Sequence, residues 1–283
     1  MFKKQRKKYG HLPPKEAEEL PRSRVNVDLI GPYVVHTPMT THTLRALTMI
    51  DRVTNWFEVT AIQDKNASTV MEAFNNTWLT RYPRPQYIGY DNGSEFKAQF
   101  KETCDNYGIK EKSSTTNNPQ SNGIIERVHQ VLGNSLRTFE HKEKELDTND
   151  PWGTFLSAAA WAIRSTVHTT LDATPGQLVF GRDMLQPIQI KTDWAQIRQR
   201  KQDMINFNNR KENAKRIEHE YRVGGKVLLE KPGLVSKLSA PCTGPYRITH
   251  TYTNGTVRIQ RGVVNERVNV RRLTPYKERA LPN

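Results

Sequence analysis

Between residues 23 and 180, the order of the apolar segments leaves few folds open to this chain. Three short runs of branched and aromatic residues come first, and a helix-like run, a further strand-like run and more helix-like runs follow. Within Ala67 to Thr80, the residues Val70, Phe74 and Trp78 recur every four positions, which is the spacing of one helix face. Early strands followed by alternating helices and strands predict a mixed α/β sheet covered by helices.

The segments on either side of this core differ from it in composition. Residues 1–22 are a basic run followed by Pro13-Pro14 and acidic residues, and we expect a basic tether there. After the core at 23–180, residues 181–220 become polar, charged and helix-favouring, which predicts a helical linker. Residues 221–283 hold short β-rich runs separated by turns, which predict a small β-barrel.

The net charge of +14 is unevenly distributed along the chain. The core at 23–180 carries −2, whereas residues 1–22 carry +4, residues 181–220 carry +3 and residues 221–283 carry +9. Basic segments around a near-neutral centre suit a polyanionic partner such as nucleic acid, because binding to phosphates releases counterions. A merely solvated basic surface is the alternative.

Membrane insertion and structural zinc are not expected. No run approaches the roughly 18 to 20 apolar residues of a membrane helix, and the N-terminus lacks the apolar stretch of a secretory signal peptide. We therefore expect a soluble protein on the reducing side of the cell. Cys104 and Cys242 lie far apart without a CxxC partner, so no zinc site is predicted and each is expected to be a small buried residue.

Three acidic residues stand out by their positions. Asp28 lies within an apolar strand, Asp91 ends another strand just before a turn, and Glu126 falls in the first turns of a helix that Asn122 could cap. Strand ends are where open α/β sheets place their sites. Three converging carboxylates without Cys suit Mg²⁺ or Mn²⁺, and two such ions about 3.5–4 Å apart can support phosphoryl transfer. Taken singly, each acid could instead cap a turn or form an ion pair.

The sequence around these acids resembles a known family. Asp91-Asn92-Gly93-Ser94-Glu95-Phe96, and the segment Asn118-Pro119-Gln120-Ser121-Asn122-Gly123-Ile124-Ile125-Glu126-Arg127, closely resemble the signature of retroviral and retrotransposon integrases. Val27-Asp28-Leu29-Ile30-Gly31-Pro32 resembles the strand that carries their first acid. The spacing of the second and third acids is one residue shorter than is usual in that family.

The resemblance implies an RNase H-like catalytic core in which Asp28, Asp91 and Glu126 form the catalytic and metal-binding triad, with two Mg²⁺ or Mn²⁺ ions. It also implies that the loop before the helix positions a DNA end. One turn beyond the third acid, where relatives often carry Asn or a basic residue, this chain departs from the pattern, so we expect the donor-DNA contacts to differ in detail. The DNA-contacting residues expected in this region are Asn118, Gln120, Ser121, Asn122, Gly123, His129 and Gln130.

The C-terminal segment carries a second part of the resemblance. Gly244-Pro245-Tyr246 and Val268-Asn269-Val270-Arg271-Arg272-Leu273-Thr274-Pro275-Tyr276 are similar to the C-terminal module of gypsy-type integrases, which implies an SH3-like β-barrel after a helical linker. Alternate residues of a strand project to one face, so arginines there can form a surface for the phosphate backbone. The arginines expected to bind DNA are Arg258, Arg261, Arg267, Arg271 and Arg272, with solvated surface arginines as the alternative.

Together, these features imply an integrase that carries out 3′-end processing and strand transfer by two-metal-ion phosphoryl transfer. The expected partners are element ends and target DNA, a second copy of the chain and, as a further candidate, chromatin, but no membrane. The expected location is the nucleus, or a cytoplasmic retrotransposon particle before nuclear entry.

Two other functions compete with this interpretation. A domesticated, non-catalytic DNA- or chromatin-binding protein is the first alternative. The intact triad argues against it, and the absence of a His-His-Cys-Cys zinc domain argues partly for it. We interpret that absence as a truncated gene model, a processed fragment or a degenerate copy. A true ribonuclease H would not explain the C-terminal module.

Overall fold

The computed structural model describes residues 7–18, 20–36, 41–91, 93–97, 99–111, 123–141, 150–231 and 240–276. The described chain divides into two compact units. We call residues 18–201 the core unit, and residues 7–17 together with 202–276 the terminal unit. Across these residues, no helix has the length and apolar character to cross a membrane.

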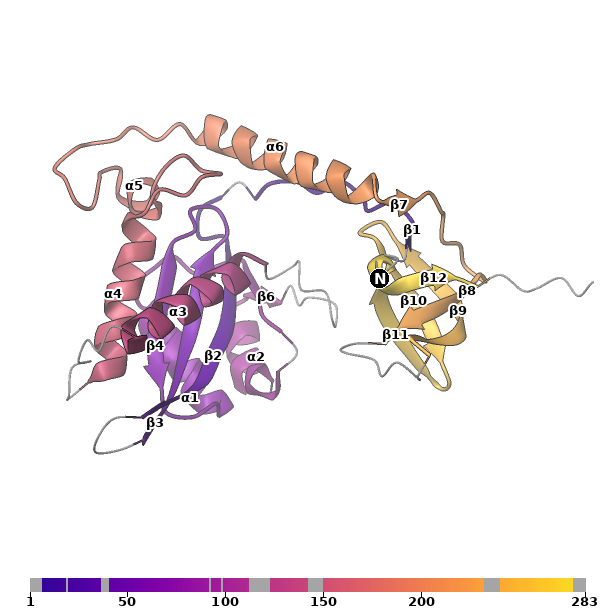
Figure 1. Ribbon diagram of the computed structural model, residues 1–283, viewed down its shortest axis with the longest axis horizontal. Helices are drawn as coiled ribbons and strands as arrows, with labels where there is room; N and C mark the ends of the chain where they lie inside the picture. Colours follow the sequence, from indigo (N-terminus) through magenta and orange to yellow (C-terminus); the bar gives the residue numbers. More distant parts are fainter. Residues whose placement is uncertain are drawn as a thin grey trace, which may run out of the picture. The chain divides into compact units, whose positions relative to one another are not determined.

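The core unit is built on a five-stranded sheet with the order β4-β3-β2-β5-β6 (Figure 1). β2 (Arg24–His36) pairs antiparallel with β3 (Thr41–Asp51), and β3 pairs antiparallel with β4 (Phe57–Ile62). β5 (Tyr87–Gly89) runs parallel to β2, and β6 (Lys110–Glu111) runs parallel to β5. This is the mixed sheet that the segment order predicts.

Helices cover both faces of this sheet. α1 (Ala67–Phe74), which continues as a π-helical turn Asn75–Leu79, packs with α2 (Gln99–Asn106) on one face. α3 (Gly123–His141) and α4 (Pro151–Ser165) pack on the other face, and Figure 1 shows α3 lying across the strands. The side chains of Val70, Phe74 and Trp78 are all completely buried, so the predicted apolar face of the first helix is confirmed.

Local sequence signals explain where two of the helices begin and end. Asp150 caps α4, since its carboxylate accepts a hydrogen bond from the backbone N–H of Gly153. α5 (Pro175–Phe180) begins with a capping box, in which Thr174 and Gln177 exchange side chain-to-backbone hydrogen bonds. It ends at Gly181, whose φ of 66° suits a residue without Cβ.

α6 (Trp194–Asn213) forms the linker, in agreement with the helix-favouring composition of this segment. In the core unit, Ile197 is buried with Leu171 and Leu178. Nζ of Lys201 donates hydrogen bonds to the backbone oxygens of Arg52 and Val53, at 2.5 and 2.6 Å. These contacts attach the first half of α6 to the core unit.

The terminal unit contains a five-stranded antiparallel sheet with the order β11-β10-β9-β8-β12. Its strands are β8 (Lys226–Glu230), β9 (Cys242–Tyr252), β10 (Thr256–Arg261), β11 (Val264–Asn269) and β12 (Leu273–Pro275). One face is buried in a separate apolar core. The predicted small β domain is present, but β11 and β12 do not pair with each other in the described residues, so the sheet is not a closed barrel.

Residues 7–17, which we call the N-terminal strap, belong to the terminal unit. β1 (Lys8–Tyr9) pairs parallel with β7 (Arg216–Ile217), and Leu12 is buried in the core of the β8–β12 sheet. The side chain of Asn213 accepts a hydrogen bond from the backbone N–H of Leu12 at 2.8 Å and donates one to its oxygen at 3.1 Å.

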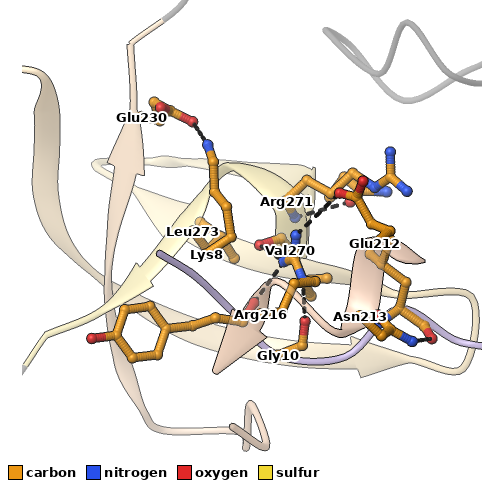
Figure 2. Close-up of polar contacts among 12 residues, drawn as sticks. Lys8, Gly10, Glu212, Asn213, Arg216, Glu230, Val270, Arg271 and Leu273 are labelled. Atoms are coloured by element: carbon orange, nitrogen blue, oxygen red, sulfur yellow. Dashed lines mark hydrogen bonds and ion pairs between the residues drawn. The ribbon is translucent and has the colours of Figure 1, made fainter. Parts of the chain in front are cut away.

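The guanidinium of Arg216 completes this attachment (Figure 2). It donates to the backbone oxygens of Gly10 at 2.5 Å, Tyr9 at 2.6 Å and Val270 at 3.4 Å. The sequence predicts only a tether over residues 1–22, because this segment is charged and proline-rich and has few apolar residues besides Leu12 that could be buried. The structure differs because the backbone groups of the strap form hydrogen bonds with β7 and with the side chains of Asn213 and Arg216, which are far away in the sequence.

Candidate active site

Asp28 lies in the middle of β2 and faces the helical layer that contains α3. Successive side chains of a strand point to opposite faces. Val25 and Val27 pack in the core with α1 and α2, whereas Ile30, which has the same parity as Asp28, packs with α3 and α4. The Asp28 side chain is 22% exposed, and its Oδ1 accepts a hydrogen bond from the backbone N–H of Leu29 at 2.9 Å.

Asp91 reaches the same level of the sheet from the neighbouring strand. β5 runs parallel to β2, with Gly89 opposite Asn26, so Asp91 and Asp28 each lie two residues further along. Oδ1 of Asp91 accepts a hydrogen bond from the backbone N–H of Gly93 at 2.9 Å, and the residue is exposed. One carboxylate oxygen of Asp91 is thus used by the backbone of Gly93.

Glu126 lies in the first turn of α3 and is exposed. The adjacent Ile125 is completely buried against the sheet, as are Leu132 and, nearly so, Leu136 further along the helix. These apolar contacts hold the helix on the face to which Asp28 points.

The electrostatics place these acids in one neighbourhood. Burial, together with the smaller effect of the negative charges of Asp91, Glu126 and Glu95, raises the pKa of Asp28 to about 7, although the hydrogen bond from Leu29 opposes this rise. Within the described ranges, no three His, Cys, Asp or Glu side chains are grouped closely enough to hold a metal ion. The negative charges of these acids therefore act on Asp28, but the side chains are not close enough together to form a set of metal ligands.

Glu95 is an acid near Asp28 that the sequence analysis does not single out. It lies in a 3-10 turn, Ser94–Phe96, and its carboxyl group folds back over Gly93. A Cβ at Gly93 would come within 2.5 Å of that carboxyl group, so glycine leaves the space that Glu95 uses. The signal was available, because Glu95 belongs to the Asp91–Phe96 motif.

His129 lies beside Asp28, one helical turn after Glu126. Its Nδ1 is 3.9 Å from Oδ2 of Asp28, and its Nε2 is 2.8 Å from Oγ1 of Thr48. Burial lowers the pKa of His129 to about 4, so the imidazole is neutral at physiological pH. Its predicted contact with DNA stays a prediction.

A pocket of about 380 Å³ lies along α3 and β2. Its lining residues come from the end of β2 and from one side of α3: Tyr33, Val34, His129, Gln130, Gly133, Leu136 and Arg137. Gln130 is exposed there, and Gly123 is the first residue of α3. The other predicted DNA contacts of this region, Asn118, Gln120, Ser121 and Asn122, lie outside the described residues.

In the terminal unit, two of the five predicted DNA-binding arginines lie together. Arg258 on β10 is directly opposite Arg267 on β11, and both are exposed. Their guanidinium carbons lie 5.8 and 4.0 Å from the centre of the Tyr252 ring. The three side chains form a basic and aromatic surface, which we call the Tyr252 surface. Arg267 also donates from Nε to Oγ1 of Thr256 at 2.9 Å.

The other three arginines lie apart from the Tyr252 surface. Arg261 pairs with Glu266 at 3.4 Å, and Arg272 donates to the backbone oxygen of Glu230 at 3.1 Å. Arg271 is half-buried, and burial lowers its pKa. Arg271 and Arg272 lie in a 3-10 turn, so the alternation of a strand does not apply to them.

Known proteins resemble this core in sequence and in fold. Residues 21–119 match the family model described as "Integrase core domain". In a comparison of folds, the chain resembles a chain of a simian T-cell lymphotropic virus intasome solved in complex with PP2A regulatory subunit B56 gamma. The TM-score is 0.66 with 18% identity, over 98% of this chain and 86% of that chain. The chain therefore shares the fold of that intasome chain, and the family match lies within the core unit.

Two sequence relatives of this chain are Pol polyproteins, one of a retrotransposon and one of a retrovirus. The retrovirus-related Pol polyprotein from transposon 412 of Drosophila melanogaster is 27% identical over 268 residues, which are 86% of this chain and 21% of the relative. The Pro-Pol polyprotein of simian foamy virus type 3 (strain LK3) is 28% identical over 170 residues, 59% of this chain and 14% of the relative. Residues 21–119 thus match the integrase core domain family, and the chain is similar in sequence to retrotransposon and retroviral Pol polyproteins. It spans about a fifth, or less, of the length of these relatives.

Proposed function

We propose that this chain is an integrase that processes the 3′ ends of an element's DNA and joins them to target DNA. The observation that carries the proposal is the position of Asp28. This carboxylate is largely buried on the sheet, and Asp91, Glu126 and Glu95 all raise its pKa. Acids that repel one another within a fold are costly unless a cation or another function compensates for them.

The chemistry of the donors, rather than their spacing in this structure, fits a hard divalent cation. Asp28, Asp91 and Glu126 would hold Mg²⁺ or Mn²⁺, with two ions expected, because carboxylate oxygens are the ligands that these ions prefer. Bound metal would activate an attacking oxygen and stabilise the leaving oxygen of a phosphodiester. The chain itself supplies a fixed strand for Asp28, a turn for Asp91 and an anchored helix for Glu126.

The terminal unit would hold DNA. Arg258 and Arg267 lie opposite each other on neighbouring strands, an arrangement that is unfavourable between like charges unless an anion lies nearby. A phosphate backbone would supply that anion, and the +9 charge of residues 221–283 supports the same role. We propose an SH3-like arrangement for this sheet. In the core unit, we propose that the segment before α3, together with His129 and Gln130, contacts the element DNA.

Assembly and location complete the proposal. The chain would act as a homo-oligomer on element ends and target DNA, in the nucleus or in a cytoplasmic particle before nuclear entry, with chromatin as a further partner. The alternative is a domesticated, non-catalytic DNA- or chromatin-binding protein, for which the Tyr252 surface would suffice without the acids.

A DNA-cleavage experiment separates these two functions. The full chain is incubated with supercoiled plasmid and Mn²⁺, and nicked and joined products are resolved by electrophoresis. We expect products with the wild type and none above background with Asp28→Asn. Glu72→Gln is the matched control, since it removes an exposed acid on α1. Equal products from the wild type and Asp28→Asn would refute the proposed mechanism, and DNA binding without any product would favour the non-catalytic alternative.

A further inference from the structure

A chain of two hydrogen bonds connects the helix that carries Glu126 to the strand that carries Asp28. On α3, His129 lies three residues after Glu126, and its Nε2 is 2.8 Å from Oγ1 of Thr48 on β3. The same Oγ1 donates to the backbone oxygen of Asp28 on β2, also at 2.8 Å. Thr48 and Asp28 are register partners across β2 and β3, so both side chains face α3.

The direction of the bond from Thr48 to Asp28 favours one tautomer of His129. The hydroxyl proton of Thr48 is donated to the backbone oxygen of Asp28, so this hydroxyl can only accept from the imidazole. The tautomer with its proton on Nε2 satisfies this contact, and Nδ1 lies 3.9 Å from Oδ2 of Asp28.

Burial makes this link stronger than a similar contact at the surface. Thr48 is completely buried, and the side chain of His129 is 18% exposed. The contacts that Ile125, Leu132 and Leu136 of α3 make with the sheet are apolar. Apolar contacts are not directional, so they do not fix the position of the helix along the strands. Hydrogen bonds require defined geometry, so they can fix how far α3 slides or turns over the strands.

We infer that His129 and Thr48 are positioning residues for the acid site, which lock Glu126 in register with Asp28. This inference rests on the proposed function, because it assigns the pair a role at the proposed metal site. Ligands that come from different elements bind a metal well only when outer contacts hold them in place, and loss of such contacts typically weakens metal binding or activity about 10- to 100-fold.

The test is a Mn²⁺ titration of the full chain, followed by the rise in melting temperature. Thr48→Val removes the hydroxyl at nearly constant volume, and we expect the Mn²⁺ midpoint to increase by about 10-fold or more. His129→Leu should act in the same direction. Thr48→Ser and His129→Gln restore a hydroxyl and an N–H donor, so both should recover most of the affinity.

Thr54→Val is the matched control. Thr54 is also completely buried, and its hydroxyl donates to Oδ2 of Asp51 at 2.6 Å, away from the acid site. This variant should lose stability in a similar way but keep the wild-type Mn²⁺ midpoint. In the cleavage assay, Thr48→Val should lower kcat at saturating DNA, whereas KM for DNA should change little.

Three results would overturn the inference. The first is an equal Mn²⁺ midpoint in Thr48→Val and Thr54→Val, and the second is a failure of Thr48→Ser to recover affinity although it folds. Both leave the proposed function intact. The third is a wild-type protein that shows neither a Mn²⁺ response nor cleavage, which would remove the proposed function and this inference together.

Discussion

Replacing Leu12 by Ala should unfold the terminal unit more easily while leaving the core unit unchanged. Leu12 is 6% exposed and packs among the apolar side chains of the β8–β12 sheet, although it is more than 200 residues distant from them in sequence. Removing a buried leucine side chain costs about 2–5 kcal/mol, through lost burial and the cavity left behind.

Hydrogen exchange of the full chain measures this effect locally. A loss of at least 2 kcal/mol corresponds to about 30-fold faster exchange of the most protected amides in β8, β9 and β10, because each 1.4 kcal/mol is about tenfold. Amides of β2 and β3 should exchange at the wild-type rate. The neighbouring His11→Ala is the control, since His11 is exposed.

Unchanged exchange in β8–β10 of Leu12→Ala would refute the reasoning, because it would mean that the strap contributes nothing to this sheet. The expected result also has a practical consequence. A fragment that begins after residue 17 would expose the site of Leu12 and leave Arg216 without two of its three carbonyl partners. Truncations should therefore keep the strap with the C-terminal segment.

Three further predictions follow from the charges. Burial raises the pKa of Asp28 from its ordinary value of 3.8 to about 7 in the folded chain, so the stabilising contribution of this group is fully present below pH 3.8 and is lost as the pH rises towards 7. Thermal unfolding without metal should show this loss, of up to about 4 kcal/mol, and Asp28→Asn should abolish it; a flat profile in the wild type would contradict the assignment. Arg258→Ala and Arg267→Ala should each reduce the slope of log affinity against log salt concentration by about 0.9 on duplex DNA, whereas Arg272→Ala should leave this slope unchanged. Gel-shift titrations at several salt concentrations measure the slopes, and equal slopes in all variants would show that the Tyr252 surface does not bind phosphate. Asp51→Ala should lower the free energy of unfolding of the core unit by at least about 2 kcal/mol, because Asp51 is buried and accepts hydrogen bonds from Arg22, Val53 and Thr54. The Mn²⁺ midpoint should stay unchanged in this variant, and a shifted midpoint would place Asp51 in the metal site.

Periodicity and capping signals were sufficient to predict much of the core unit. The four-residue spacing of Val70, Phe74 and Trp78 identified a helix face that is completely buried. Alternation along β2 could also have placed Asp28 and Ile30 on one face. Both features depend on residues close together in sequence, so they are visible before the fold is known.

Contacts between distant segments could not be predicted in the same way. The N-terminal strap reads as a tether because its partners, β7 and Arg216, are about 200 residues away. The link between Thr48 and His129 depends on the register of β2 and β3 and on the placement of α3, and no local pattern encodes either. Arg271 and Arg272 were expected on an exposed strand, but they lie in a 3-10 turn, where Arg271 is half-buried and Arg272 donates to the backbone oxygen of Glu230.

The central claim is that Asp28, Asp91 and Glu126 form one metal site, and counting bound Mn²⁺ by electron paramagnetic resonance tests it most directly. The full chain should bind two ions, and each of Asp28→Asn, Asp91→Asn and Glu126→Gln should reduce the number bound or weaken the binding strongly, whereas Glu72→Gln should not. Wild-type Mn²⁺ binding in any one of the three acid variants would contradict the account, since that acid would then lie outside the site.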